Sequence, residues 1–272
     1  MSFLASYTFA KSIDNASGQG GGPGTGGVIN PGAVGETSPI LGNQFDNRAN
    51  RGVSDFDRTH RFVFSGIYAL PTPAFAKDSR IGRVLLGNFQ LGTIFTTQSG
   101  LPIDIVDTGA ASFYGLTLGR PNFAPGASRE TAMTNIPAGY FFNPAAFARP
   151  IVAAGAPIPS SGGAAIAGAA GTDFGSIGRN ILRGPRQTNV DFSVIKRFAI
   201  DERRNIEFRS EFFNLFNHVN FANPISDLNA VIASGGSLNP TTGQVINPGG
   251  FGRIISTSNN PRLIQFALKF NF

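Results

Sequence analysis

The chain has 272 residues, of which only 14% are charged, whereas ordinary globular domains carry about 25%. There is no cysteine, which excludes a disulfide framework, a thiolate metal site and a cysteine nucleophile. The net charge of +6 comes from basic residues scattered singly along the chain, so it does not indicate nucleic-acid binding, and the low charge content indicates a non-aqueous partner.

The first element that we expect is a β-strand near residues 2–11. In SFLASYTFAK, Phe3, Ala5, Tyr7 and Phe9 fall on one parity, and a period of two is typical of a strand with one apolar face. The length of about ten residues is what a tilted strand needs to cross the hydrocarbon core of a membrane.

Two more segments alternate in the same way, and we expect strands near 60–70 (HRFVFSGIYAL) and 83–99 (within it GNFQLGTIFTTQ). In each, one parity is apolar and the other is mainly polar or small. The phenylalanines on the apolar parity are Phe62, Phe64, Phe89 and Phe95.

The last three alternating segments predict strands near 188–198, 204–217 and 262–272. The middle one also fits helical spacing, but the alternation of its charged residues favours a strand. Lys196 breaks the apolar parity close to one end, where a long side chain can reach the membrane interface.

The connections between these strands alternate in length. Residues 12–59, 100–187 and 218–261 form long connections, whereas 71–82 and the AIDER turn are short. This asymmetry is typical of outer-membrane barrels, which have short periplasmic turns and long extracellular loops. The long connections are rich in Gly, Ala, Pro, Ser and Asn, so we expect them to bury little and to be flexible or turn-rich.

The predicted fold is therefore all-β: a curved antiparallel meander of about six transmembrane strands, forming an incomplete outer-membrane β-barrel. The longest weakly apolar stretch, 151–171, is broken by prolines, so a membrane could be crossed only by strands. We expect the apolar parity to face lipid at Phe62, Phe64, Phe89, Phe95, Phe192, Phe208, Phe212, Phe266 and Leu268. We expect the polar parity to face the lumen at Asp191, Glu207, Arg209, Glu211 and Lys269.

Little in the sequence indicates catalysis or a cofactor. The two histidines, His60 and His218, each stand at a strand end without a third ligand at metal spacing, so we expect neither a metal nor another cofactor. An acidic and basic group lies where the first long connection meets its strand. It fits either an acid/base site or, as we prefer, a turn-capping ion-pair network, and its members are Asp55, Asp57, Arg58 and Arg61.

The last eight residues, QFALKFNF, resemble the C-terminal signal by which the outer-membrane assembly machinery recognises barrel proteins. Gln265 takes the polar position, and Phe270 and Phe272 take the aromatic ones. Ala267 replaces the usual glycine.

The wider chain resembles the C-terminal part of the barrel of a TonB-dependent outer-membrane receptor, most closely the Oar-like group. The resemblance runs through NRGVSDFDRTHRFVFSGIYALP, FQLGTIFTTQSGLPI, FGSIGRNILRGPRQTNVDFSVIKRF and IEFRSEFFNLFNHVNFANP. It implies energy-coupled uptake by a barrel of 22 strands, with extracellular loops that capture substrate and an N-terminal plug. We expect residues 1–272 to hold the last six strands without the plug, and the TonB system to act only through absent N-terminal regions.

Two other functions remain open at this point. A secreted all-β binding or adhesion module would pack its Phe-rich face between two sheets. A glycan-active β enzyme would need two carboxylates about 5–10 Å apart in a cleft. We prefer a membrane-embedded barrel segment without enzymatic activity, located in the bacterial outer membrane, with lipid, the remaining strands and the plug as its partners.

Overall fold

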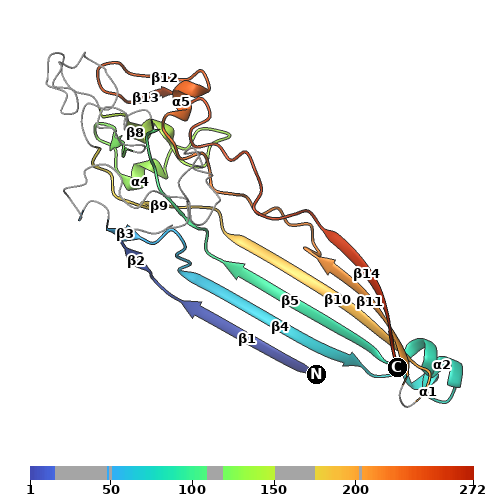
Figure 1. The fold of residues 1–272 in the computed structure, drawn as a ribbon. Helices are drawn as coiled ribbons and strands as arrows, with labels where there is room; N and C mark the ends of the chain where they lie inside the picture. The colour runs from blue at the N-terminus through green and yellow to red at the C-terminus, as the bar shows by residue number, and fades with distance from the viewer. Residues whose placement is uncertain (16–47, 49–50, 109–118, 151–174, 202–203) are drawn as a thin grey trace.

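A computed structural model describes residues 1–15, 48, 51–108, 119–150, 175–201 and 204–272. The described residues form a long curved sheet with a compact group of loops at one end, which we call the cap (Figure 1). A small pair of helices lies at the opposite end of the sheet.

The sheet has six antiparallel strands in the order β1-β4-β5-β10-β11-β14. Each long strand therefore pairs with the long strands that come before and after it in the sequence. This confirms the prediction of a six-stranded antiparallel meander. The strands are β1 (Ser2–Phe9), β4 (His60–Leu70), β5 (Phe89–Gln98), β10 (Gln187–Ala199), β11 (Asn205–Phe213) and β14 (Leu263–Asn271).

The register of these strands places the apolar parities on one face. Ala5 lies opposite Phe64 and Phe64 opposite Phe95, while Phe212 lies opposite both Phe192 and Ile264. Because residues directly opposite each other in a sheet point to the same side, the alternation in each strand adds up to one continuous apolar face and one polar face.

Two predicted strand boundaries were wrong. The strand expected over 83–99 begins only at Phe89, because Arg80–Leu86 form helix α2, which starts at the capping residue Ser79. The strand expected over 204–217 ends at Phe213, because Asn214 adopts a left-handed conformation with φ of 51° and turns the chain. The helix-like spacing at the end of that segment belongs to this turn.

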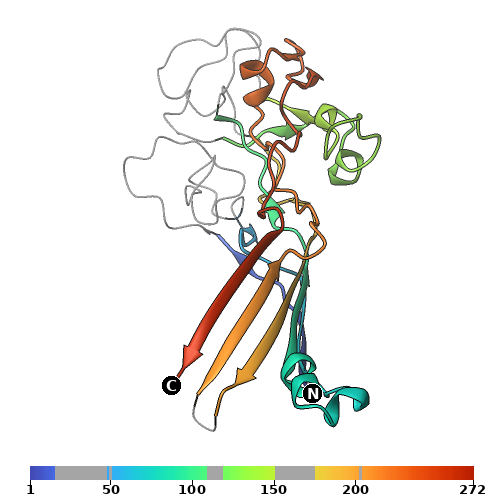
Figure 2. The same ribbon diagram turned by 90° about the vertical axis from the view of Figure 1, so that its right-hand side faces the viewer.

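The cap is made of short elements from the three long connections (Figure 2). Its two-residue and three-residue strands pair as β2–β3, β6–β9, β7–β8 and β12–β13. The strands are β2 (Ile13–Asp14), β3 (Gly52–Val53), β6 (Pro102–Ile103), β7 (Asn122–Phe123), β8 (Phe147–Ala148), β9 (Leu182–Arg183), β12 (Ser237–Leu238) and β13 (Val245–Asn247). The helices are α4 (Arg129–Ala132), η2 (Pro144–Ala146) and α5 (Ala230–Ala233).

The cap has its own hydrophobic core, contrary to the expectation that the long connections bury little. Phe142, Phe147 and Phe251 have no exposed surface, and their rings meet edge to face with centroids 5.1–5.7 Å apart. The low-complexity segment 234–250 is turn-rich as predicted, yet it contributes the buried Val245. The other two low-complexity segments, 17–27 and 153–171, lie outside the described residues.

The sheet joins the cap where β5 and β10 continue into the short strands β6 and β9. Gly100 lies so close to Gly184 there that a Cβ atom at Gly100 would be 2.0 Å from the Gly184 carbonyl oxygen, so glycine is required by close backbone approach. None of the helices in the described part of the chain has the length and hydropathy needed to span a membrane.

Candidate functional surfaces

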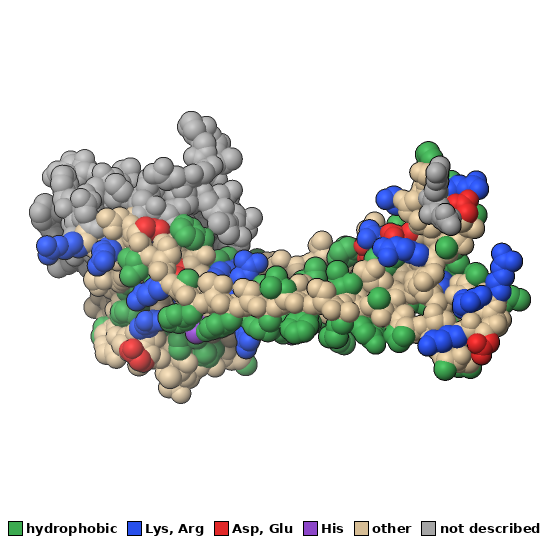
Figure 3. Space-filling view, turned by 90° about the horizontal axis from the view of Figure 1, so that it is seen from below, with side chains coloured by type: hydrophobic (Ala, Val, Ile, Leu, Met, Phe, Trp, Pro, Cys, Tyr) green, Lys and Arg blue, Asp and Glu red, His purple; other side chains and the backbone are tan. Residues whose placement is uncertain are grey.

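The apolar face of the sheet is largely uncovered in the described part of the chain. Phe266 is 66% exposed and Leu268 is 74% exposed, and no second described sheet packs on them. Seen along the sheet, hydrophobic side chains follow one side of it (Figure 3). All the residues predicted to face lipid lie on this face: Phe62, Phe64, Phe89, Phe95, Phe192, Phe208, Phe212, Phe266 and Leu268.

The polar face carries a row of ion pairs across β10 and β11. Glu207 accepts a hydrogen bond from Arg197 at 2.7 Å and lies 3.1 Å from Arg209. Arg209 is in turn 3.9 Å from Glu211, and Lys269 lies opposite Glu207 in the register. The predicted lumen-facing residues therefore share one face, and all except Asp191 belong to this row.

A groove with a volume of about 440 Å³ runs along the polar face. Its lining includes Asp191 and Glu211, two carboxylates of the kind that a glycan-active enzyme would need. Each has a local partner: Asp191 accepts from the Asn214 amide at 2.9 Å and from the side chain of Asn189, and Glu211 lies beside Arg209. Both carboxylates therefore interact with neighbouring groups of the sheet and its turns, which is typical of a structural role.

Lys196 is the exception on the apolar face. It lies near the end of β10, as expected, but its side chain is only 4% exposed. Its Nζ donates to the carbonyl of Gly87 and lies 4.5 Å from the centre of the Phe89 ring. A hydrogen bond and a cation–π contact thus replace the water that this ammonium group loses.

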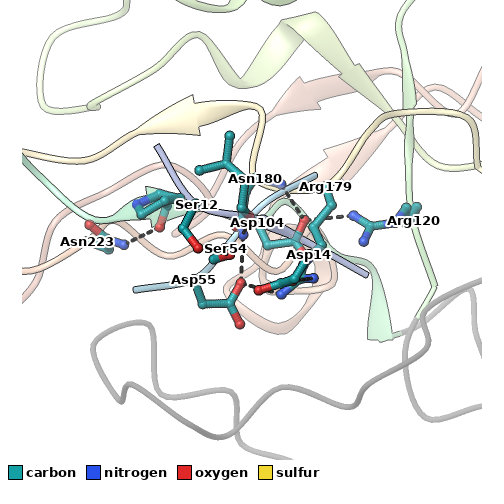
Figure 4. Close-up of polar contacts among 11 residues, drawn as sticks. Ser12, Asp14, Ser54, Asp55, Asp104, Arg120, Arg179, Asn180 and Asn223 are labelled. Atoms are coloured by element: carbon teal, nitrogen blue, oxygen red, sulfur yellow. Dashed lines mark hydrogen bonds and ion pairs between the residues drawn. The ribbon is translucent and has the colours of Figure 1, made fainter. Parts of the chain in front are cut away.

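A polar network joins the first and second long connections at the base of the cap (Figure 4). Arg179 donates to Asp14 at 2.6 Å and to Asp55 at 2.9 Å. Asn180 donates to Asp55 at 2.6 Å and to the carbonyl of Val53. We call this group, with Asp57 and Arg183, the neck network.

Asp57 and Arg183 form the second half of the neck network. The Asp57 carboxylate accepts from the amide of Ser12 at 2.7 Å, from Thr59 and from Arg183 at 2.8 Å. Burial raises the pKa of the Asp57 carboxyl, but the Ser12 amide and the Arg183 guanidinium outweigh burial and hold that pKa below its usual value. Arg58 donates to the carbonyl of Ser99 at 2.6 Å.

These contacts confirm the predicted capping and ion-pair role of the group around Asp55 and Asp57. Its partners Arg179, Asn180 and Arg183 were missed, because they lie more than 120 residues further along the chain. The signal available in the sequence was an arginine-rich segment, GRNILRGPRQ, that directly precedes a strand, but nothing in one sequence pairs it with the earlier acidic segment.

Among the described residues, two further ion pairs lie within the second long connection, and one of them adjoins the neck network because Asp104 accepts from the amide of Asn180. Arg149 binds Asp107 through two hydrogen bonds of 2.7 Å, the forked geometry that suits guanidinium and carboxylate. Arg120 donates to Asp104 at 2.7 Å and is 2% exposed, and its Nε and Nη2 atoms have no hydrogen-bond partner in the part of the chain that the structure describes. This second pair has capacity for a further polar group.

The two histidines lie at the ends of the long strands nearest the cap. The Nδ1 atom of His60 forms a 2.8 Å hydrogen bond with the Tyr7 hydroxyl, and the His60 ring packs against Phe9. His218 follows the Asn214 turn, with its amide bonded to the Asn214 side chain. Among the described residues, no cluster of His, Asp and Glu could hold a metal ion.

The comparisons with known proteins agree with this geometry. A family model described as "Outer membrane beta barrel domain" matches residues 1–265. The chain belongs to this outer-membrane β-barrel family. Neither the curated proteins nor the solved structures include a match to the chain.

Family membership decides between the functions that the sequence left open. It places the chain in the bacterial outer membrane, in a family that is typically non-enzymatic. A secreted sandwich needs a second layer over the phenylalanines, and the described sheet is a single layer. The glycan-active enzyme has less support, because the carboxylates of the groove have structural partners.

The C-terminal segment forms the outer strand β14. Gln265 lies on the polar face opposite Glu211, and Phe270 lies on the apolar face opposite Ile206. Phe272 follows the strand, is 95% exposed and stacks against Phe270 with ring centroids 5.9 Å apart. The family match stops at residue 265, before these rings, so their part in an assembly signal stays a prediction.

Proposed function

We propose that this chain forms part of the wall of a TonB-dependent transporter, with the apolar face against lipid and the polar face toward the lumen. The observation that carries this proposal is the shared register of six strands, which collects apolar side chains on one face and a row of ion pairs on the other. In lipid the apolar face needs no covering layer, and an aqueous lumen solvates the charged row.

The edges of the sheet support a wider barrel. In the described part of the chain, β1 and β14 are the outermost strands, each paired on one side only. Six strands are fewer than the eight of the smallest outer-membrane barrels, so closure needs further strands. By resemblance, these are N-terminal strands of the same receptor, which also supplies the plug inside the barrel.

The cap supplies the surface function in this proposal. It lies at the end reached by all three long connections, which is the extracellular end in outer-membrane barrels. Its own core and the neck network hold it on the sheet, so that it presents a defined surface for substrate capture. The TonB system acts through N-terminal regions outside this chain.

Barrel closure can be tested with an epitope tag between Thr241 and Thr242, which are exposed in the cap. We expect the tagged product, expressed from its own gene in the outer membrane, to migrate on gel electrophoresis as one polypeptide longer than the 272 residues of this chain. Its migration should change on heating, because heat unfolds a closed barrel. Chemical cross-links at multiples of the 272-residue chain would instead show that copies of the chain close the barrel.

Transport can be tested by deleting the gene and growing the bacterium on iron chelates, cobalamin, glycans or peptides as limiting nutrients. We expect loss of growth on one class of nutrient and the same loss when the energy-coupling protein is deleted. Normal growth of the deletion strain on every class would contradict the transport proposal while leaving the barrel assignment intact.

We also propose that Gln265, Phe270 and Phe272 are read by the barrel assembly machinery. Replacing Phe272 with Ser should lower the amount of folded protein in the outer membrane, whereas replacing the neighbouring Asn271 with Ser should not. Equal amounts of both variants would exclude a signal at the last ring.

A further inference from the structure

The link between β4 and β5 is a compact helical hairpin formed by α1 (Ala74–Lys77) and α2 (Arg80–Leu86). The Ser79 hydroxyl caps α2 by accepting from the amide of Gly82 at 3.2 Å. Ala76 is buried and packs against Gly82. A Cβ atom at position 82 would lie only 2.7 Å from the Ala76 carbonyl oxygen, so the two helices approach each other closely at this glycine. We call residues 71–88 the link hairpin.

The link hairpin turns its large apolar side chains outward. Phe75 is 80% exposed, Ile81 71% and Leu85 58%, and no residue of α2 is buried. Ile81, Val84 and Leu85 have the i, i+3, i+4 spacing of one helix face. A folded unit that exposes its apolar face in this way needs a partner that accepts apolar groups.

The charged residues of the link hairpin define that partner further. Lys77, Arg80 and Arg83 are all exposed, against one acidic residue, Asp78. Apolar and basic residues side by side on a short helix are typical of segments that lie in the interface of an anionic lipid surface.

The position of the link hairpin continues the apolar face of the sheet. Lys196 and Phe89, both on that face, meet the end of α2 through the hydrogen bond from Lys196 to the Gly87 carbonyl. Figures 1 and 2 place both helices at the end of the sheet opposite the cap. The hairpin lies at the end of the short connections, which is the periplasmic side of an outer-membrane barrel.

We propose that the link hairpin is a membrane-surface anchor on the periplasmic leaflet. Phe75, Ile81 and Leu85 enter the boundary between headgroups and acyl chains, while the three basic side chains bind the phosphates of anionic phospholipids. Lys196 fixes the hairpin to the wall, so that the hairpin sets the depth of this end of the sheet in the membrane. This inference rests on the membrane placement of the sheet and not on transport.

The chain contains no tryptophan, so single tryptophans can report on each position. We would compare Phe75→Trp with Phe266→Trp on the apolar face and with the cap control Ile255→Trp, whose native side chain is 76% exposed. The full chain is reconstituted in vesicles of phosphatidylcholine and phosphatidylglycerol that carry brominated acyl chains. We expect blue-shifted, bromine-quenched emission from Phe75→Trp and Phe266→Trp, and unquenched emission from Ile255→Trp.

The three reporters separate the ways in which the proposal can fail. If Phe266→Trp is quenched while Phe75→Trp emits like the cap control, the sheet is in the bilayer and the anchor is wrong. If Phe75→Trp is blue-shifted without quenching, a protein surface covers the hairpin, which also overturns the anchor. If Phe266→Trp is not quenched, the membrane placement and the anchor fail together.

The role of charge is tested in the Phe75→Trp background with Lys77→Gln, Arg80→Gln and Arg83→Gln combined. We expect quenching on vesicles containing phosphatidylglycerol to fall to the level seen on phosphatidylcholine alone. The matched control changes three exposed basic residues of the cap region, Arg51→Gln, Arg129→Gln and Arg253→Gln, and should leave quenching unchanged. Equal behaviour of the two triple variants would remove phosphate binding from the proposal.

Discussion

The sheet and the cap use phenylalanine in opposite ways. In the cap, Phe142, Phe147 and Phe251 are fully buried and touch one another. In the sheet, rings such as Phe266 point away from the protein and are mostly exposed. The difference teaches that the cap completes its hydrophobic core from its own residues, whereas no described part of the chain covers the apolar side chains of the sheet.

The largest expected effect comes from opening the cap core. Phe142→Ala should lower the free energy of unfolding of the cap by about 3–5 kcal/mol, because it removes a fully buried ring and leaves a cavity. Pulse proteolysis in urea, with cleavage sites in the cap followed separately, measures this. Phe266→Ala removes the same ring from the apolar face and should leave cap proteolysis unchanged, so equal destabilisation by both variants would contradict the comparison.

The next largest effect separates the two faces of the sheet. Ile94 and Phe95 are neighbours on β5 but point to opposite faces of the sheet. Arginine substitutions at the two positions therefore differ only in the face on which the charge is placed. Phe95→Arg should cost about 2–4 kcal/mol, since the charge would meet hydrocarbon, whereas Ile94→Arg points into the groove and should cost far less. Urea titration of folded protein in lipid vesicles measures both, and the opposite ranking would reverse the assignment of the faces.

A smaller effect is expected at the junction between the sheet and the cap. Arg179 uses two different nitrogens for Asp14 and Asp55, and lysine has no such fork. Arg179→Lys should therefore weaken the attachment of the first long connection by about 1.5–3 kcal/mol, the range for hydrogen bonds to charged groups. Hydrogen exchange of residues 12–15 and 51–57 reports this loss, and Arg129→Lys on the exposed helix α4 is the control.

The smallest expected effect is a decrease in the stability of the cap at low pH. Because the pKa of Asp57 is lower in the folded protein than in the unfolded chain, its contribution is complete above about pH 3.9 and is lost as pH falls through the lower folded value. Proteolysis of the cap should thus become faster as the pH falls below about 3.9. Asp57→Asn should flatten this part of the profile, and an unchanged profile would show that Asp57 is not the group responsible.

The sheet could be predicted from the sequence, whereas the cap could not. A strand such as Ile264–Phe270 displays its two faces in its alternation, because an apolar side and a polar side impose a period of two. The cap core has no such period: Phe142 and Phe251 come from different connections and are brought together by turns. Helix α2 was missed for a similar reason, since seven residues give too few turns for a clear helical pattern beside an alternating strand.

The contacts within the cap also set an order for its maturation. Thr108 bonds to Asp227, 119 residues away, and Arg179 to Asp14, 165 residues away, with strands of the sheet between them in each case. Bringing such distant segments together is slow until something else closes the intervening loops, and hairpin pairing of the strands does so. The cap is therefore the last part to form: its segments come together only once the strands beneath them stand in register.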